Sequence, residues 1–206
     1  MEVRWLGHSC FKLTHQGHSV VIDPFQPGSV PGLRDIQETA DMVLCSHAHF
    51  DHNYADGVAI GPDAKPAFFD VTAINVCHDD KDGTLRGLSD IYLIEVDGWR
   101  IAHFGDIGCA LTADQKIMLQ NLDLALIPVG GYYTIDGLQA AELVKELSPR
   151  TVIPMHYTGD TYGFDEIARV ETFTALFDEN DIRYETGPAV VLEKPMDRQI
   201  IVLSYV

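Results

Sequence analysis

The sequence predicts an α+β fold in one domain that spans residues 1–206. Three observations support this prediction. Short apolar runs bounded by turn residues recur along the whole chain, as strands do. A smaller number of segments show helical periodicity, and Leu138–Leu147 is the clearest amphipathic helix among them. Finally, 206 residues of which 46% are hydrophobic suit one sizeable core and require no second domain.

The first third of the chain is predicted to begin with a meander of three strands, Val3–Leu6, Cys10–His15 and Ser19–Asp23. A loop rich in proline and glycine follows over Pro24–Gly32. The pattern then predicts, in order, a helical turn, a short buried strand and a helix that stops at Gly61-Pro62; their ranges are Ile36–Ala40, Met42–Cys45 and Asp51–Val58.

The rest of the chain alternates strands and helices. Asp97-Gly98 is the strongest hairpin signal in the sequence, between strands at Ile91–Val96 and Trp99–Phe104. Other strands are predicted at Ala73–Val76, Leu124–Val129, Thr151–Pro154, Val190–Leu192 and Ile200–Tyr205. Helices are predicted at Thr112–Leu122, Leu138–Leu147 and Asp165–Glu179.

Composition excludes several classes of function. Fourteen basic and 31 acidic residues give a net charge of −17, which opposes binding to long nucleic acids. No apolar run is long enough to cross a membrane. The four cysteines form no C-x-x-C pair and the amino terminus lacks the features of a signal peptide, so a reducing cytoplasm is expected. A small-molecule substrate suits this composition, and a homo-oligomer is compatible with it.

Residues 43–54, VLCSHAHFDHNY, carry four metal-binding side chains within six positions. In an extended segment alternate side chains point the same way, so His47 and His49 can hold one ion. If a helix begins near Phe50, the adjacent side chains of Asp51 and His52 diverge by about 100 degrees and can serve a second ion. The cluster therefore predicts a site for two metals.

Further metal-binding side chains follow the ends of other predicted strands. These residues are His78, Asp106 and His156, and Asp23 closes an earlier strand in the same way. Enzymes built from sheets and helices commonly place their sites at such strand ends. The full set comprises His47, His49, Asp51, His52, His78, Asp106 and His156. Five imidazoles and two carboxylates suit two divalent ions, with zinc favoured and iron or manganese also acceptable.

These residues, in this order, resemble the motifs of the metallo-β-lactamase superfamily. The shared features are an early aspartate (Asp23), H-x-H-x-D-H from His47 to His52, and the later His78, Asp106 and His156. The segments WLGHSCFKL, VIDPF, HFGDIG, LIPVGGYYT and VIPMHYTG are similar to a compact branch of uncharacterised metal-dependent hydrolases related to ascorbate-phosphate lactonase.

The resemblance implies a four-layer αββα sandwich, with two facing mixed sheets and helices outside. It also implies that one metal is held by His47, His49 and His78, that the other is held by Asp51, His52 and His156, and that Asp106 bridges them. Asp23 is expected to fix the orientation of a metal ligand without binding a metal itself. His8, which belongs to the segment WLGHSCFKL, is expected to support a loop or a residue that orients a metal ligand, and not to bind a metal itself.

The expected activity is hydrolysis of a small ester, lactone, thioester or phosphorylated metabolite. Two ions about 3.5 to 4 Å apart share a water, lower its pKa and provide a bridging hydroxide as nucleophile, while Asp51 and Asp106 hold the ions. Tyr132 or Tyr133, after a strand aimed at the same edge, could donate a hydrogen bond to an oxyanion, although either could also be a pocket wall.

Two alternatives remain open at the level of sequence. A metal-dependent phosphodiesterase or nuclease would use the same hydroxide, but it would need a basic exosite, and the 14 cationic residues are dispersed. A di-iron redox enzyme or a non-hydrolytic metal-binding module is the second alternative, because imidazole and carboxylate sites also bind iron. A phosphate-binding function would further require a cation near the metals, from a lysine or from Arg34, Arg86, Arg100, Arg150, Arg169 or Arg183.

Overall fold

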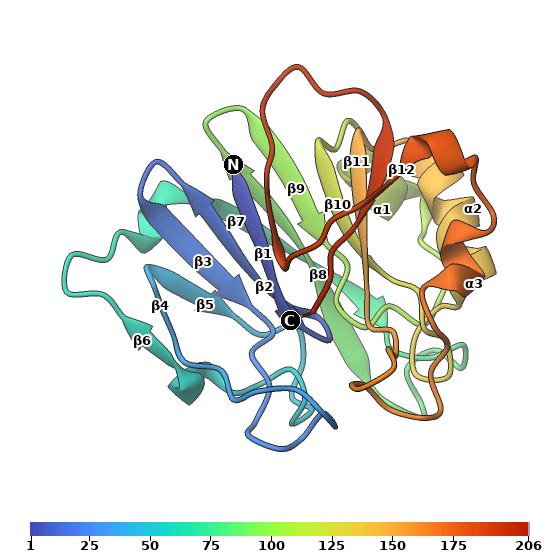
Figure 1. Ribbon diagram of the computed structural model, residues 1–206, viewed down its shortest axis with the longest axis horizontal. Coiled ribbons are helices and arrows are strands. Elements are labelled where there is room, and N and C mark those ends of the chain that lie inside the picture. Colours follow the sequence, from blue (N-terminus) through green and yellow to red (C-terminus); the bar gives the residue numbers. More distant parts are fainter. Residues whose placement is uncertain (206) are drawn as a thin grey trace.

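The computed structural model describes residues 1–205 and contains two mixed β-sheets that face each other (Figure 1). The first sheet has the strand order β13 (Ala189–Val191), β1 (Glu2–Gly7), β2 (Cys10–His15), β3 (His18–Ile22) and β5 (Met42–Leu44). The second has the order β12 (Ile182–Tyr184), β14 (Gln199–Val202), β11 (Thr151–Met155), β10 (Leu124–Pro128), β9 (Trp99–His103), β8 (Leu88–Val96) and β7 (Asp70–Cys77).

Both sheets contribute to one core. Trp5 and Phe11 of the first sheet belong to the same buried cluster as Ile91 and Ile101 of the second sheet. Phe104, which directly follows β9, belongs to this cluster too. The strands β10 and β11 are buried along their whole length, since they pair with parallel neighbours and are covered on both faces. The predicted two-sheet sandwich is confirmed.

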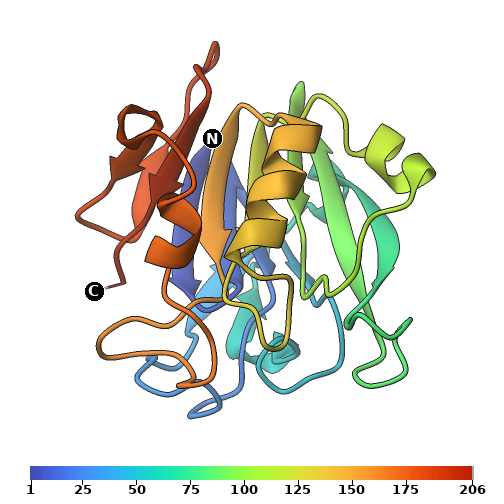
Figure 2. The ribbon, with the colours of Figure 1, turned by 90° about the vertical axis from the view of Figure 1, so that its right-hand side faces the viewer.

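The two outer faces of the sandwich are covered differently. The helices α1 (Ala113–Met118), α2 (Gly137–Leu147) and α3 (Glu171–Thr174) all lie outside the second sheet (Figure 2). Over the first sheet, Val21 packs in a second cluster with Phe25 and Val30 of the following loop. The same cluster includes Ala40 and Val58 from a small parallel sheet of β4 (Glu38–Ala40) and β6 (Val58–Ile60).

Three predicted helical segments are wrong. Ile36–Ala40 ends in the strand β4, and the segment Asp51–Val58 holds a turn, the 3₁₀ turn η1 (Ala55–Gly57) and the start of β6. A pairing between segments 20 residues apart decides both outcomes, because Glu38 pairs with Val58. Two more 3₁₀ turns, η2 (Pro66–Phe68) and η3 (Glu179–Asp181), complete the elements.

The segment Asp165–Glu179 is mostly irregular, and its α-helical part is the four-residue α3. Its first part is held by hydrogen bonds to other segments. The backbone N–H of Ala168 donates to the carbonyl of Gly130, and its carbonyl accepts from the N–H of Thr158. These backbone groups are therefore not available for helical hydrogen bonds.

Candidate metal centre

The carboxylate of Asp106 lies at the centre of a group of imidazoles that come from three other segments of the chain. Its Oδ2 atom is 3.2 Å from Nε2 of both His52 and His156. The same oxygen is 3.4 Å from Nε2 of His78 and 4.0 Å from Nε2 of His47. A single carboxylate oxygen thus faces side chains that follow β5, β7 and β11.

On one side of Asp106, the ligand atoms of His47, His49 and His78 all lie within 4.8 Å of one another. Nε2 of His47 is 3.0 Å from Nδ1 of His49. These two histidines lie in a bent segment that follows β5, and His78 joins them from the end of β7.

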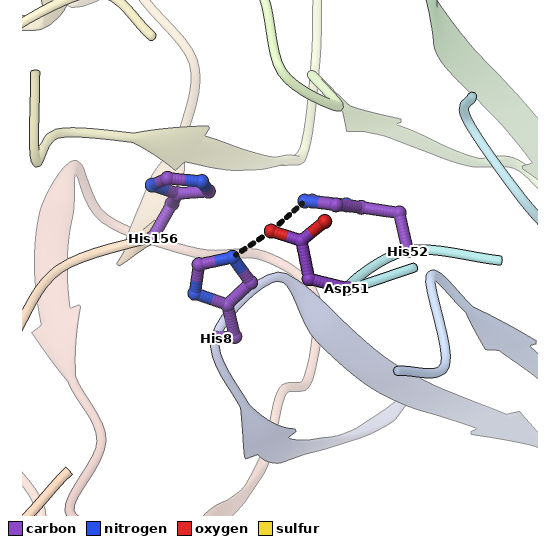
Figure 3. A group of neighbouring side chains, drawn as sticks. All are labelled: His8, Asp51, His52 and His156. Carbon is purple, nitrogen blue, oxygen red and sulfur yellow. Dashed lines mark ion pairs between the residues drawn. The ribbon is translucent and has the colours of Figure 1, made fainter. Parts of the chain in front are cut away.

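On the other side, the ligand atoms of His8, Asp51, His52 and His156 form a second such group (Figure 3). Oδ2 of Asp51 is 3.4 Å from Nε2 of His8 and 3.7 Å from Nε2 of His52. The rings of His8 and His156 lie 4.0 Å apart between centroids. Asp51 and His52 reach this group from a tight turn, in which the N–H of His52 donates to the carbonyl of His49.

Three residues of the centre have left-handed backbone conformations, which cost energy for residues other than glycine. The φ angles are 53° for His8, 53° for His156 and 50° for Asp23. The N–H of His156 also donates to the carbonyl of His8, so the loops after β1 and β11 are joined directly. Gly130 is required beside them, because a Cβ atom there would lie 2.1 Å from the carbonyl oxygen of His156.

Asp23 is fully buried and connects histidines of both groups. It accepts hydrogen bonds from Nδ1 of His52 at 2.9 Å and from Oγ of Ser46 at 2.6 Å. Oγ of Ser46 is in turn 3.0 Å from Nδ1 of His47. This network assigns the Nδ1–H tautomer to the neutral form of both rings, in which the lone pair of Nε2 can bind a metal.

Burial favours the neutral, metal-binding form of His8, His47 and His78. Burial lowers the pKa of His8 to about 4 and that of His47 to about 3, so both rings are neutral near pH 7. Burial alone would raise the pKa of Asp106, but His156 and His52 lower it well below its usual range. His52 is the exception among the imidazoles, since Asp106 and Asp23 overcome its burial and raise its pKa. The centre therefore favours positive charge between its carboxylates.

Several buried polar atoms of the centre have no hydrogen-bond partner within residues 1–205. They include Nε2 of His52, both ring nitrogens of His156 and Oδ1 of Asp106. Buried polar atoms without partners cost free energy, and divalent cations bound to these imidazole and carboxylate atoms would remove that cost. This set of imidazole nitrogens and carboxylate oxygens therefore fits divalent metal ions.

A cavity of about 240 Å³ opens over the donors His49, Asp51, His78 and Asp106. The remainder of its wall is formed by Phe50, Arg86, Tyr133 and Phe164. Of the two tyrosines considered from the sequence, only Tyr133 reaches this cavity. Tyr132 is 64% exposed and lies outside the wall.

Sequence reasoning did not single out Ser46 or Phe164, and it could not place Arg86. Ser46 had a usable signal, because it lies between the predicted strand Met42–Cys45 and the first candidate histidine ligand, although the structure leaves that strand, β5, only half-buried. Arg86 and Phe164 reach the cavity on irregular loops, for which periodicity gives no information.

The sandwich and its cluster of histidines and aspartates define a class of metal-dependent hydrolases, and comparisons with known proteins agree. Residues 2–156 match the family model described as a beta-lactamase superfamily domain. A UPF0173 metal-dependent hydrolase of Thermus thermophilus is 31% identical, covering 76% of this chain and 84% of that protein. One from Methanoregula boonei is 32% identical, with coverage of 86% and 94%.

Solved structures give the same result. A candidate Zn-dependent hydrolase of the metallo-β-lactamase superfamily from Thermotoga maritima superposes with a TM-score of 0.77 and 31% identity, over 98% of this chain and 97% of that one. Igni18, a metallo hydrolase from Ignicoccus hospitalis, gives a TM-score of 0.57 and 26% identity, over 76% of this chain and 82% of that one. The chain belongs to the UPF0173 metal-dependent hydrolases of the metallo-β-lactamase superfamily.

Within residues 1–205, no helix is both long and apolar enough to span a membrane.

Proposed function

We propose that this hydrolase is a dinuclear enzyme that acts on a small ester, lactone, thioester or phosphorylated metabolite. One ion is held by His47, His49 and His78, the other by Asp51, His52 and His156, and Asp106 bridges them. The observation that supports this arrangement best is the position of Asp106 Oδ2, which is 3.2 to 4.0 Å from Nε2 atoms of both groups. Five imidazoles and two carboxylates favour zinc.

When bound, two divalent ions lower the pKa of a shared water and polarise the oxygen of the bond under attack. The protein must hold the ligands in place for this chemistry. Asp23 orients a histidine of each group, by a direct hydrogen bond to His52 and through Ser46 to His47. His8 contacts Asp51 at 3.4 Å and fixes the orientation of that carboxylate.

Tyr133 is the proposed donor to the oxyanion that forms during attack. Its phenol lines the cavity beside the metal ligands, and its ring lies 6.4 Å from that of His156. Burial raises the pKa of the Tyr133 phenol, so the hydroxyl remains protonated and can donate. Phe50 and Phe164 give the cavity apolar walls, which suit a small organic substrate better than a nucleic acid.

The expected site of action is the cytoplasm. This proposal is supported by the four cysteines, Cys10, Cys45, Cys77 and Cys109, which are all free thiols in the structure.

The test is metal analysis followed by a substrate panel. We expect the purified protein to bind two equivalents of zinc and to hydrolyse at least one class among lactones, thioesters and phosphodiesters. His49→Ala should lose this activity. Less than about one equivalent of tightly bound metal, or activity that survives in His49→Ala, would contradict the proposal. Turnover of bis-nitrophenyl phosphate far above that of any lactone or thioester would instead favour a phosphodiesterase.

A further inference from the structure

Arg86 is the cationic side chain in the wall of the cavity, beside the metal ligands His78 and Asp106. Its guanidinium carbon lies 5.5 Å from the ring centroid of Tyr133. Stacking on an aromatic ring limits the conformations of an arginine side chain and leaves its N–H groups free to bind an anion.

The loop that carries Arg86 is held in place by Asp79, the residue after the metal ligand His78. The buried carboxylate of Asp79 accepts the backbone N–H of Arg86 at 2.8 Å. It also accepts the N–H groups of Lys81, Gly83 and Leu85, at 2.8, 3.0 and 2.9 Å. The N–H of His78 donates to the carbonyl of Gly87 and closes the loop. The position of Arg86 is thus fixed relative to a metal ligand.

The charge of Arg86 has no carboxylate partner within 4.0 Å among residues 1–205. By contrast, four other arginines of this acidic chain form ion pairs: Arg4, Arg100, Arg169 and Arg183. Asp79, although close in the chain, binds the backbone of Arg86 and not its guanidinium. A positioned arginine in a site wall, without a carboxylate partner, is suited to bind an anionic group of a ligand.

We propose that Arg86 binds an anionic group of the substrate, a carboxylate or a phosphate monoester, while the scissile bond lies over the metal centre. This inference rests on the proposed hydrolase function and narrows its substrate to small anionic esters or lactones. A cavity of about 240 Å³ has room for a metabolite with only a few bonds between the two groups. The substrate must span the distance from the guanidinium of Arg86 to the metal centre, and this distance selects substrates in which few bonds separate the anionic group from the scissile bond.

The test compares three 4-nitrophenyl esters with the zinc-loaded enzyme. They are the butyrate, which is neutral, the hydrogen glutarate, which ends in a carboxylate, and 4-phosphonooxybutyrate, which ends in a phosphate. For each anionic ester, kcat/KM is divided by the value for the neutral one. Arg86→Met removes the charge and keeps an unbranched side chain against Tyr133. We expect it to lower at least one ratio by about ten- to a hundredfold, through KM.

Arg150→Met is the matched control. It removes the same charge from an exposed side chain at the start of β11, the end of that strand opposite to His156, and should leave both ratios unchanged. The ester whose ratio falls more in Arg86→Met identifies the anion as carboxylate or phosphate. If Arg86→Met lowered kcat/KM equally for the neutral and anionic esters, or did not lower it at all, both ratios would be unchanged. Either result would overturn the proposed role of Arg86. An absence of hydrolysis by wild-type enzyme with two zinc equivalents would instead overturn the function on which it rests.

Discussion

Asp23, which follows β3, and His52, which lies in the turn beyond β5, are joined by a buried hydrogen bond of 2.9 Å between Oδ2 and Nδ1. Oδ2 of Asp23 also accepts from Ser46 Oγ, which contacts His47. One carboxylate therefore contacts a histidine of each donor group, directly for His52 and through Ser46 for His47.

Replacing this carboxylate should weaken both metals. We expect Asp23→Asn to lower affinity at both sites by about ten- to a hundredfold, because the amide carries no charge and replaces one of the two acceptor oxygens by an NH2 group, which cannot accept from Ser46 or His52. Ser46→Ala should affect mainly the site of His47. Competition with a chelator measures both affinities, and Asp41→Asn is the control, because Asp41 lies beside the start of β3, the end of that strand opposite to Asp23. Unchanged affinities in Asp23→Asn would show that Asp23 serves only the fold.

His156 should be as important to the second metal as His52. The two Nε2 atoms lie at equal distances of 3.2 Å from Asp106 Oδ2, although they are supplied by segments more than 100 residues apart. We expect His156→Ala and His52→Ala each to retain one equivalent of zinc, measured by mass spectrometry. His15→Ala, on an exposed hairpin, should retain two. Two full equivalents in His156→Ala would refute the shared site.

His8 is predicted to support Asp51 and not to bind metal. Its Nε2 atom contacts Asp51 at 3.4 Å, but its ring also lies in the second donor group. We expect His8→Ala to keep two equivalents of zinc, with affinity at the second site reduced by about ten- to a hundredfold. Loss of a whole equivalent in this variant would make His8 a direct ligand instead.

The hydroxyl of Tyr133 should act on the chemical step. Tyr133→Phe removes the hydroxyl but keeps the ring against which Arg86 stacks. Because one oxyanion donor contributes about a hundredfold or more to rate, we expect kcat to fall by about that factor while KM changes little. Tyr132→Phe, outside the cavity, should behave as wild type in the same steady-state assay. Equal effects of the two variants would argue against the assigned donor.

Asp41 should make the fold sensitive to acid. Burial disfavours its carboxylate, but hydrogen bonds from His18, Lys65 and Ser19 prevail and lower its pKa from 3.8 to about 2. A lowered pKa stabilises the folded state fully above the unfolded value and loses this effect as pH falls through the folded value. Urea unfolding of wild type and Asp41→Asn should therefore differ by on the order of 1 kcal/mol at pH 5, and the difference should shrink toward pH 2. A constant difference would contradict this assignment.

Local pattern was sufficient for much of the fold. The strands β1 to β3, the hairpin of β8 and β9, and the helix α2 follow from alternation, from Asp97-Gly98 and from an amphipathic period, all of which act within a few residues. The errors at Ile36–Ala40 and Asp51–Val58 have one cause. These segments pair with each other as β4 and β6, and a pairing between distant residues leaves no periodic signal in either of them.

The sequence by itself determined the family and the kinds of side chain in the centre, because ligand residues recur at the ends of apolar strands and in a fixed order. Only the tertiary structure decided how these residues are arranged. In the folded chain, Asp106 Oδ2 lies between both donor groups and His8 contacts Asp51. Tyr133 and Arg86 line the cavity, whereas Tyr132 lies outside its wall. The physical reason is that distances between side chains on different loops depend on packing and on buried hydrogen bonds, such as those of Asp23 and Asp79, and not on any repeat in the chain.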